Sequence, residues 1–437
     1  MHLLFENIMK LLVLWWTGTF KDLDEGEGSF QLDVKVWEAI GNATYASGST
    51  IPSSFGARPP NIVEDKQATT ADTWSFWLLY LGPILLQDKF RSSSYHRHFC
   101  DLASIVERFL QFEIEREQLP KLRSACEEWV KGYERLYYQH DPERVSACPL
   151  TIHGLLHIPD ALEEIGPIWT HWAFPTERFC GRLQPAIKSR RHPFAAIDNY
   201  IVLQAQLSQV KLIYGVEDEL SLKILRSTIP ARHFAHIDYP SCILLPPQRP
   251  ASTVPVNIVD RILISFATRF NTRKATIRQY LLQDSISQWA KVRRLNGGDD
   301  MNSSDMASFS EDRRDATFVR YDMLVDINAR RRAVAPVYEK KSFYGQLRHI
   351  LVVSLSAGDE LHTDAETTYI LAAIERCKII GTSLSGAPYY EQMGAIEVVD
   401  MSVVQCLVGR VVATDGKRTY IIDRTGTLQS SYYVTGE

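Results

Sequence analysis

Closely spaced cysteine pairs are missing from this 437-residue sequence: none of its seven cysteines belongs to a C-x-x-C motif. They are dispersed along the chain, at Cys100, Cys126, Cys148, Cys180, Cys242, Cys377 and Cys406. An odd, scattered set of thiols argues against a disulfide framework or a zinc ribbon. It is typical of reduced cysteines in an intracellular protein.

Long hydrophobic runs are missing as well. The apolar run near the N-terminus, Leu11 to Trp16, is too short for the core of a signal peptide and too short to cross a bilayer. Apolar residues at positions 3, 4, 8, 11, 12 and 15 recur at helical spacing. We therefore expect an amphipathic helix that packs on another part of the protein, and no membrane partner.

Several enzyme motifs are also lacking. The sequence has no G-x-x-x-x-G-K-[ST] phosphate loop, no G-x-S-x-G elbow and no local Cys/His signature. The "NGG" at 296–298 lies in a polar stretch rather than between a strand and a helix. Nucleotide hydrolysis is not indicated.

Two histidines, His153 and His157, have the i, i+4 spacing that places two imidazoles on one helix face. A zinc protease of the H-E-x-x-H type needs Glu directly after the first histidine, where this chain has Gly154. A structural zinc would have to recruit Cys148 or His171, and the apolar pair between the histidines favours a packed helix end. We predict no metal site, and a metal-dependent hydrolase centred on the two histidines stays a third hypothesis.

The formal net charge of the chain is −4, so the protein as a whole does not attract a polyanion such as DNA. The 45% hydrophobic and 23% charged residues are the balance of a soluble globular protein. Any nucleic-acid contact must come from local basic runs, which occur at 188–193, 291–295 and 329–333. The alternative for each run is a solvated helix face or loop. The candidate DNA-binding residues are Lys188, Arg190, Arg191, Arg293 and Arg294.

The order of patterns predicts an α+β protein with a mainly helical N-terminal and central region and a small β-rich C-terminal domain. Thr70 is the expected N-cap of a helix that carries Asp72 in its first turn. A further helix is expected from about 195 to 214. The expected units are a first region with a long loop (1–66), a helical domain (67–215), a proline-rich connector with helices (216–295), a flexible linker (296–315) and the β-rich domain (316–437).

Several segments, taken in order, resemble transposases of the CACTA (En/Spm) type and their relatives in fungal mobile elements. The matching pieces are "MHLLFENIMKLLVLWWTGTFK", "VWEAIG", "IPSSFGARPPNI", "TADTW" and "LLYLGPILL". They are followed by "IHGLLHIPDALEEIGPIWTHWAFPTERFCGRL", "VRRLNGGD", "FYGQLRHI", "VGRVV" and "YIIDR". The resemblance covers most of the chain, and the order of the motifs is more specific than any one of them.

This resemblance implies an RNase H-like core with three acidic residues that bind two divalent metal ions, Mg²⁺ in the intact family. The acid of "TADTW", Asp72, matches the third of these residues. In the family the first two acids lie upstream of the segment that begins here at Met1, one of them immediately before it. We therefore expect residues 1–66 to be a remnant of the catalytic region, and this chain to need no cofactor of its own.

The expected function is that of a truncated or decayed transposase-derived protein, catalytically inactive alone, with residual DNA or protein binding. The partners implied are DNA, a second copy or other transposase subunits, and the implied location is the nucleus. A protein-interaction module without any nucleic-acid role is the alternative. Salt-dependent binding to duplex DNA separates the two, because phosphate contacts weaken steeply with added salt.

Overall fold

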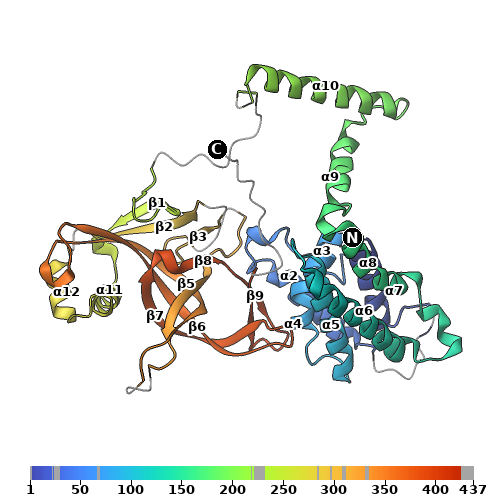
Figure 1. The fold of residues 1–437 in the computed structure, drawn as a ribbon, viewed down its shortest axis with the longest axis horizontal. Helices are drawn as coiled ribbons and strands as arrows, with labels where there is room; N and C mark the ends of the chain where they lie inside the picture. Colours follow the sequence, from blue (N-terminus) through green and yellow to red (C-terminus); the bar gives the residue numbers. More distant parts are fainter. Residues whose placement is uncertain are drawn as a thin grey trace.

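The computed structural model describes residues 2–21, 23, 30–65, 69–217, 219–220, 232–282, 285–295, 298–307, 312–329 and 334–424. The chain forms a helical body and a β-rich body that lie side by side, with a helical arm above them (Figure 1). The expected α+β class is confirmed. Among the described residues, no helix has both the length and the apolarity needed to cross a membrane.

The helical body contains the N-terminal two fifths of the chain. Its main elements are η1 (His2–Ile8), α1 (Met9–Trp16), α2 (Val34–Ser47), α3 (Ala71–Phe76), η3 (Trp77–Leu81), α4 (Gly82–Leu85), α5 (Ser93–Phe109), α6 (Leu119–Tyr133), η5 (Glu134–Tyr138), α7 (Leu150–Gly154), η7 (Leu155–His157) and α8 (Ile158–Ile165). The arm consists of α9 (Phe174–Leu183) and α10 (Pro193–Tyr214). Short 3₁₀ turns connect several of these helices.

Aromatic side chains fill the core of the helical body. Trp15 and Trp16, at the end of α1, are both fully buried. Their indole N–H groups donate to the hydroxyls of Tyr133, at 3.0 Å, and Tyr137, at 3.1 Å. The predicted N-terminal amphipathic helix is therefore confirmed, and it packs against α6 and η5.

An RNase H-like core in residues 1–66 is not seen. The described part of this region contains helices and turns and no strand. Residues 42–47 lie in the region for which a long loop is expected, but they continue α2 to Ser47, and the inner face of this helix buries Ile40, Thr44 and Ser47. The apolar residues that would cover a sheet instead pack on one another.

The β-rich body is a ten-stranded, curled antiparallel sheet. Along its main path the strands are ordered β1-β2-β5-β6-β7-β10-β9, while β3 pairs with β2, and β4 pairs with β5 and β8. The strands are β1 (Cys242–Pro250), β2 (Ser287–Arg294), β3 (Asp300–Asn302), β4 (Phe318–Asp326), β5 (Tyr338–Leu355), β6 (Thr367–Thr382), β7 (Pro388–Asp400), β8 (Val404–Leu407), β9 (Gly409–Val412) and β10 (Thr419–Ile422). Two helices, α11 (Val256–Arg269) and α12 (Lys274–Tyr280), cover one face, where Ile262 and Phe266 meet Leu371.

The predicted boundary of the β-rich domain at 316 is wrong. Residues 242–250 and 287–294 were expected to belong to a connector and a helix, but they form β1 and β2. β2 is held between β1 and β5, and three consecutive residues, Gln288, Trp289 and Ala290, are buried, so the strand lacks the simple in-and-out alternation that would reveal it. Only the α11 and α12 part of the connector is helical as predicted.

The predicted flexible linker at 296–315 is also wrong for its described residues. Met301 and Ser303 are fully buried where β3 lies on β2. The buried Asp299 accepts the backbone N–H of Leu407 at 2.8 Å and forms an ion pair with Arg424. Polar residues that look like a solvated linker in the sequence are here partners of buried groups.

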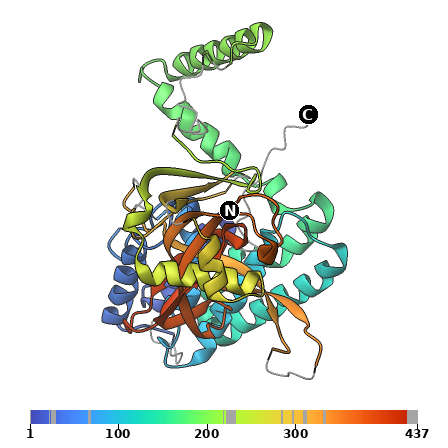
Figure 2. The same cartoon turned by 90° about the vertical axis from the view of Figure 1, so that its left-hand side faces the viewer.

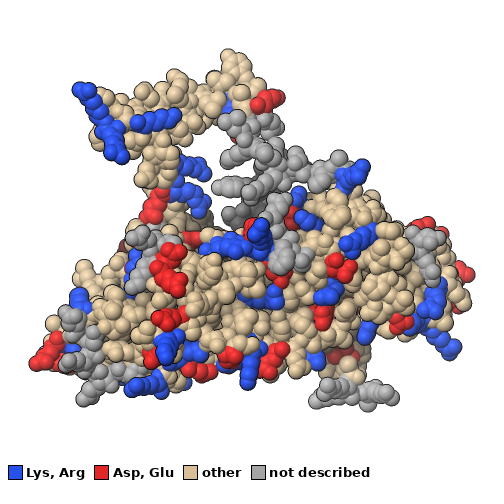
Figure 3. Space-filling view, turned by 180° about the vertical axis from the view of Figure 1, so that it is seen from behind, with Lys and Arg blue, Asp and Glu red and all other residues tan. Residues whose placement is uncertain are grey.

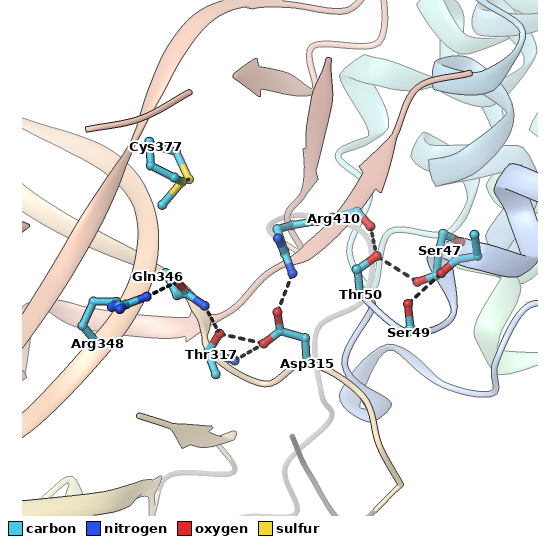
Figure 4. A network of polar contacts seen from close by, with 11 residues as sticks. Ser47, Ser49, Thr50, Asp315, Thr317, Gln346, Arg348, Cys377 and Arg410 are labelled. Carbon is cyan, nitrogen blue, oxygen red and sulfur yellow. Dashed lines mark hydrogen bonds and ion pairs between the residues drawn. The ribbon is translucent and has the colours of Figure 1, made fainter. Parts of the chain in front are cut away.

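The two bodies are joined by polar contacts that begin in this same segment. The backbone N–H of Asp315 donates to the carbonyl of Ser49 at 2.9 Å, and its carboxylate is paired with Arg410 of β9 (Figure 4). Thr50 exchanges two bonds with the backbone of Arg410, its hydroxyl donating at 2.5 Å and its carbonyl accepting at 3.1 Å. Tyr420 and Ile422 of β10 complete the core of the helical body.

The arm projects away from both bodies. Figures 1 and 2 show α9 rising from the helical body and α10 lying across its end. Neither helix has a buried residue. The predicted helix at 195–214 is confirmed, with Pro193 in its first turn and Gly215, at φ 63°, ending it in the left-handed conformation that glycine favours.

Candidate functional site

Asp72 lies where the sequence places it, in the first turn of α3. The hydroxyl of Thr70 accepts from the backbone N–H of Thr73 at 3.3 Å, which confirms Thr70 as the N-cap. The Asp72 carboxylate is exposed at the rim of a cavity of about 240 Å³ at the base of the arm. Asp72 is the only carboxylate among the described residues that line this cavity.

The cavity is mostly aromatic. Its walls come from η1, the loop after α2, α3, the turn after α5 and the start of α9, with the rings of Phe5, Phe55, Phe76, Tyr80, Phe112, Trp172 and Phe174. Trp172 and Phe174 meet edge to face at 4.9 Å. Two guanidinium groups, of Arg58 and Arg178, complete the rim. Such a lining suits a flat apolar group better than a divalent cation, which takes several oxygen ligands.

No group of three or more His, Cys, Asp or Glu side chains within the described ranges could hold a metal ion. His153 and His157 do share one face, with their Nε2 atoms 3.0 Å apart. Both are exposed, and the nearest carboxylate is that of Asp160, 3.7 Å from Nδ1 of His157. The pair therefore lacks the third ligand that a zinc site needs.

Three of the predicted DNA-binding residues come together at the bend between α9 and α10. Lys188, Arg190 and Arg191 are exposed, and Arg178 and Arg182 lie one turn apart on α9 just before them. We call these five residues the basic arm. None of them has an ion-pair partner in the part of the chain that the structure describes. Figure 3 shows Lys and Arg side chains gathered along the arm at upper left.

Arg178 and Arg182 were not among the predicted contacts. Their signal in the sequence is the i, i+4 spacing, which puts two like charges on one helix face a few residues before a basic run. That signal becomes specific only when the helix is known to stand away from the body.

Arg293 and Arg294 do not belong to this surface. They lie on β2, where Arg293 forms a bidentate pair with Asp300 of β3 at 2.6 and 2.7 Å. Arg294 donates to the carbonyl of Val404 at 2.8 Å. Both side chains therefore hold neighbouring strands, and the five predicted residues do not form one patch. The third basic run, 329–333, lies outside the described residues except for Ala329.

His98 is the most strongly perturbed histidine of the helical body. Its Nε2 contacts the carbonyl of Trp129 at 3.0 Å, and its ring is stacked on Trp129 with centroids 4.5 Å apart. Burial lowers the pKa of His98 to about 4, and the nearby Arg135 acts in the same direction. Burial also lowers the pKa of His96.

We expect stability to fall with acid because of His98. Below the unfolded pKa of 6.5 the unfolded chain takes up a proton that the folded chain refuses, so stability is lost as the pH falls from 6.5 toward 4. The loss from this one group between pH 7 and pH 5 is about 2 kcal/mol. Urea unfolding of the full chain and of His98→Gln at both pH values measures it. Equal pH dependence in the two proteins contradicts this assignment, and the remaining dependence in the variant is ascribed first to His96.

No protein-family model, curated protein or solved structure matches this chain. By its own structure the chain is an α+β protein of two bodies, with an aromatic cavity at the junction of body and arm and a basic, exposed arm.

Proposed function

We propose that this chain is a transposase-derived protein of the CACTA type, which binds DNA through the basic arm and does not cut DNA by itself. The observation that carries the DNA-binding part is the set of five exposed cations on a projecting arm. Electrostatic attraction acts over about 8 Å at physiological ionic strength, so the arm presents its own positive field although the whole chain has a net charge of −4.

The arrangement around Asp72 supports the relation to transposases. The resemblance implies that one of the first two acids lies directly before the segment that begins here with Met1, and that the third acid is Asp72. Helix η1 packs beside α3, and Phe5 of η1 lines the same cavity as Asp72. The two segments that carry these acids in the family are thus neighbours in space, while no other acid is found among the described residues that line the cavity.

Replacing Lys188, Arg190 and Arg191 together with alanine is expected to weaken binding to duplex DNA and to flatten its salt dependence. Each lost phosphate contact reduces the slope of log K against log salt by about 0.9, so three contacts reduce it by about 2.7. Fluorescence anisotropy of a labelled duplex, titrated from low to physiological salt, measures both quantities.

The matched control replaces Lys121, Arg261 and Arg278, which are also one lysine and two arginines. All three are exposed and lie on α6, α11 and α12, away from the arm. An equal loss in both triple variants would show that only net charge matters, and absence of salt-dependent binding in the full chain would favour the protein-interaction module. In the same samples Mg²⁺ is expected to leave the duplex intact; cleavage that disappears in Asp72→Ala contradicts the non-cutting half of the proposal.

A further inference from the structure

Helix α10 is apolar and uncovered. Only two of its 22 residues are charged, Asp198 and Lys211. Ten of its large apolar side chains are more than one third exposed: Phe194, Tyr200, Ile201, Val202, Leu203, Leu207, Val210, Leu212, Ile213 and Tyr214. A helix of this composition is normally buried, and an apolar surface of this size marks a site of association.

We infer that α10 pairs in antiparallel orientation with α10 of a second copy of this chain. One face of the helix carries a continuous seam at positions 196, 200, 203, 207, 210 and 214, with alternating spacings of four and three residues. This is the a/d pattern of paired helices. We call it the α10 seam; its residues are Ala196, Tyr200, Leu203, Leu207, Val210 and Tyr214.

The α10 seam is complementary to itself when it is reversed. Its spacings read the same in both directions, so a second copy in antiparallel orientation presents its seam in register. Ala196 then faces the partner's Tyr214, which places the smallest seam residue opposite one of the largest. Leu203 faces the partner's Leu207, and Tyr200 faces the partner's Val210. This match of large with small and like with like is what packing across a twofold axis requires.

The size and position of α10 also fit a second copy. The arm holds α10 away from the bodies of its own chain, and Leu203 is 63% and Tyr214 71% exposed (Figures 1 and 2). The α10 seam runs from residue 196 to residue 214, a length of about 27 Å along the helix axis. The near absence of charge on the helix means that association desolvates almost no ion.

The pairing places the two basic arms at opposite ends of the helix pair. From the rise of an α-helix, the two copies of Pro193 are then about 36 Å apart along the axis. Dimeric DNA-binding proteins contact half-sites about 34 to 36 Å apart, one turn of the duplex. This consequence rests on the proposed DNA binding, whereas self-association does not.

Sedimentation velocity of the full chain, at micromolar concentrations, tests the pairing. The unmodified protein is expected at twice the mass of the 49.8 kDa chain. The double variant Leu203→Gln, Leu207→Gln is expected as a monomer, with a dissociation constant raised by at least about 100-fold, because four leucines leave the contact of the dimer. Both residues are exposed within the single chain, so circular dichroism should show an unchanged fold.

The matched control changes the opposite face of α10, with Phe194→Gln and Leu212→Gln. These two residues are 80% and 81% exposed and lie on the side of the helix away from the seam. The control is expected to stay dimeric. A monomeric unmodified chain, a dimeric seam variant or a monomeric control each overturns the inference.

Cross-linking tests the orientation. Chains that carry Tyr200→Cys, mixed with chains that carry Val210→Cys, are expected to form a disulfide dimer under mild oxidation, above the level seen with the native cysteines. Either variant alone is expected to stay at that background level. Efficient cross-linking of one variant with itself indicates a parallel pair and overturns the antiparallel assignment. Loss of DNA binding with the dimer intact, in the basic-arm variant, tests the proposed function separately.

Discussion

Asp315→Ala is expected to lower the free energy of unfolding by about 3 kcal/mol, because it removes one partner of a shielded ion pair. The Asp315 carboxylate is 14% exposed and that of its partner Arg410 17%. It also accepts the backbone N–H of Thr317 at 2.9 Å and the Thr317 hydroxyl at 2.7 Å. Gln346 donates to that same hydroxyl at 3.1 Å, so the loss spreads into β5 (Figure 4).

The position of Asp315 gives this substitution a second effect. The guanidinium of Arg410 is paired with Asp315 and lies over the ring of Phe318, 3.6 Å from the ring centroid. The backbone carbonyl of Arg410 accepts the hydroxyl of Thr50 in the helical body. Without the carboxylate, the guanidinium loses its only ion-pair partner among the described residues and stays beside the ring. We expect the contact between the two bodies to loosen and limited proteolysis between them to become faster.

Urea unfolding followed by circular dichroism, with limited proteolysis in parallel, measures both effects. Asp364→Ala is the matched control, because Asp364 is exposed and has no ion-pair partner in the described ranges. A change within about 0.5 kcal/mol is expected for it. If Asp315→Ala behaves like the control, the pair does not join the two bodies.

Trp16→Ala is expected to destabilise the helical body by about 3–5 kcal/mol, the cost of an aromatic cavity in a packed core. Trp16 is fully buried and meets the rings of Phe90 at 5.6 Å and Phe99 at 5.4 Å. Its removal also takes away the N–H that the Tyr137 hydroxyl accepts at 3.1 Å. Burial raises the pKa of Tyr137, so its hydroxyl stays neutral in the variant.

Unfolding of the helical body, followed by circular dichroism at 222 nm, measures this loss. Trp16→Phe keeps much of the ring volume and is expected to cost less than half as much. Tyr45→Ala is the control, because Tyr45 is 67% exposed on α2. Similar losses for Trp16→Ala and Tyr45→Ala would mean that α1 is not part of the core.

Helices with caps and clear periodicity were predictable from the sequence. Thr70 caps α3 through a bond to its own first turn, and Pro193 and Gly215 bound α10 by their own backbone preferences. These signals are local, so no distant residue is needed to read them. The long strands β5 to β7 were predictable for the same reason, since their β-branched and aromatic residues show in the sequence.

The strands β1 and β2 were not predictable in this way. β1 contains prolines at 246, 247 and 250, and β2 contains three cations, and both features disfavour a strand read by itself. The pairing of β1 with β2 and of β2 with β5, together with burial in the core that contains Leu244, Trp289 and Val292, decides their structure. Likewise Asp299 and Asp315 look like linker acids until their arginine partners, more than ninety residues later, are brought beside them.

The candidate site, too, was predictable from the sequence only in part. Local sequence determined that Asp72 begins a helix and that Lys188, Arg190 and Arg191 are close to one another, because neighbours in a short run cannot be far apart. Only the tertiary structure decided that this run stands on a projecting arm, that Arg293 is bound to Asp300, and that α10 is left without a cover. Exposure, charge pairing and burial depend on which distant segments meet, and the order of residues alone does not specify that.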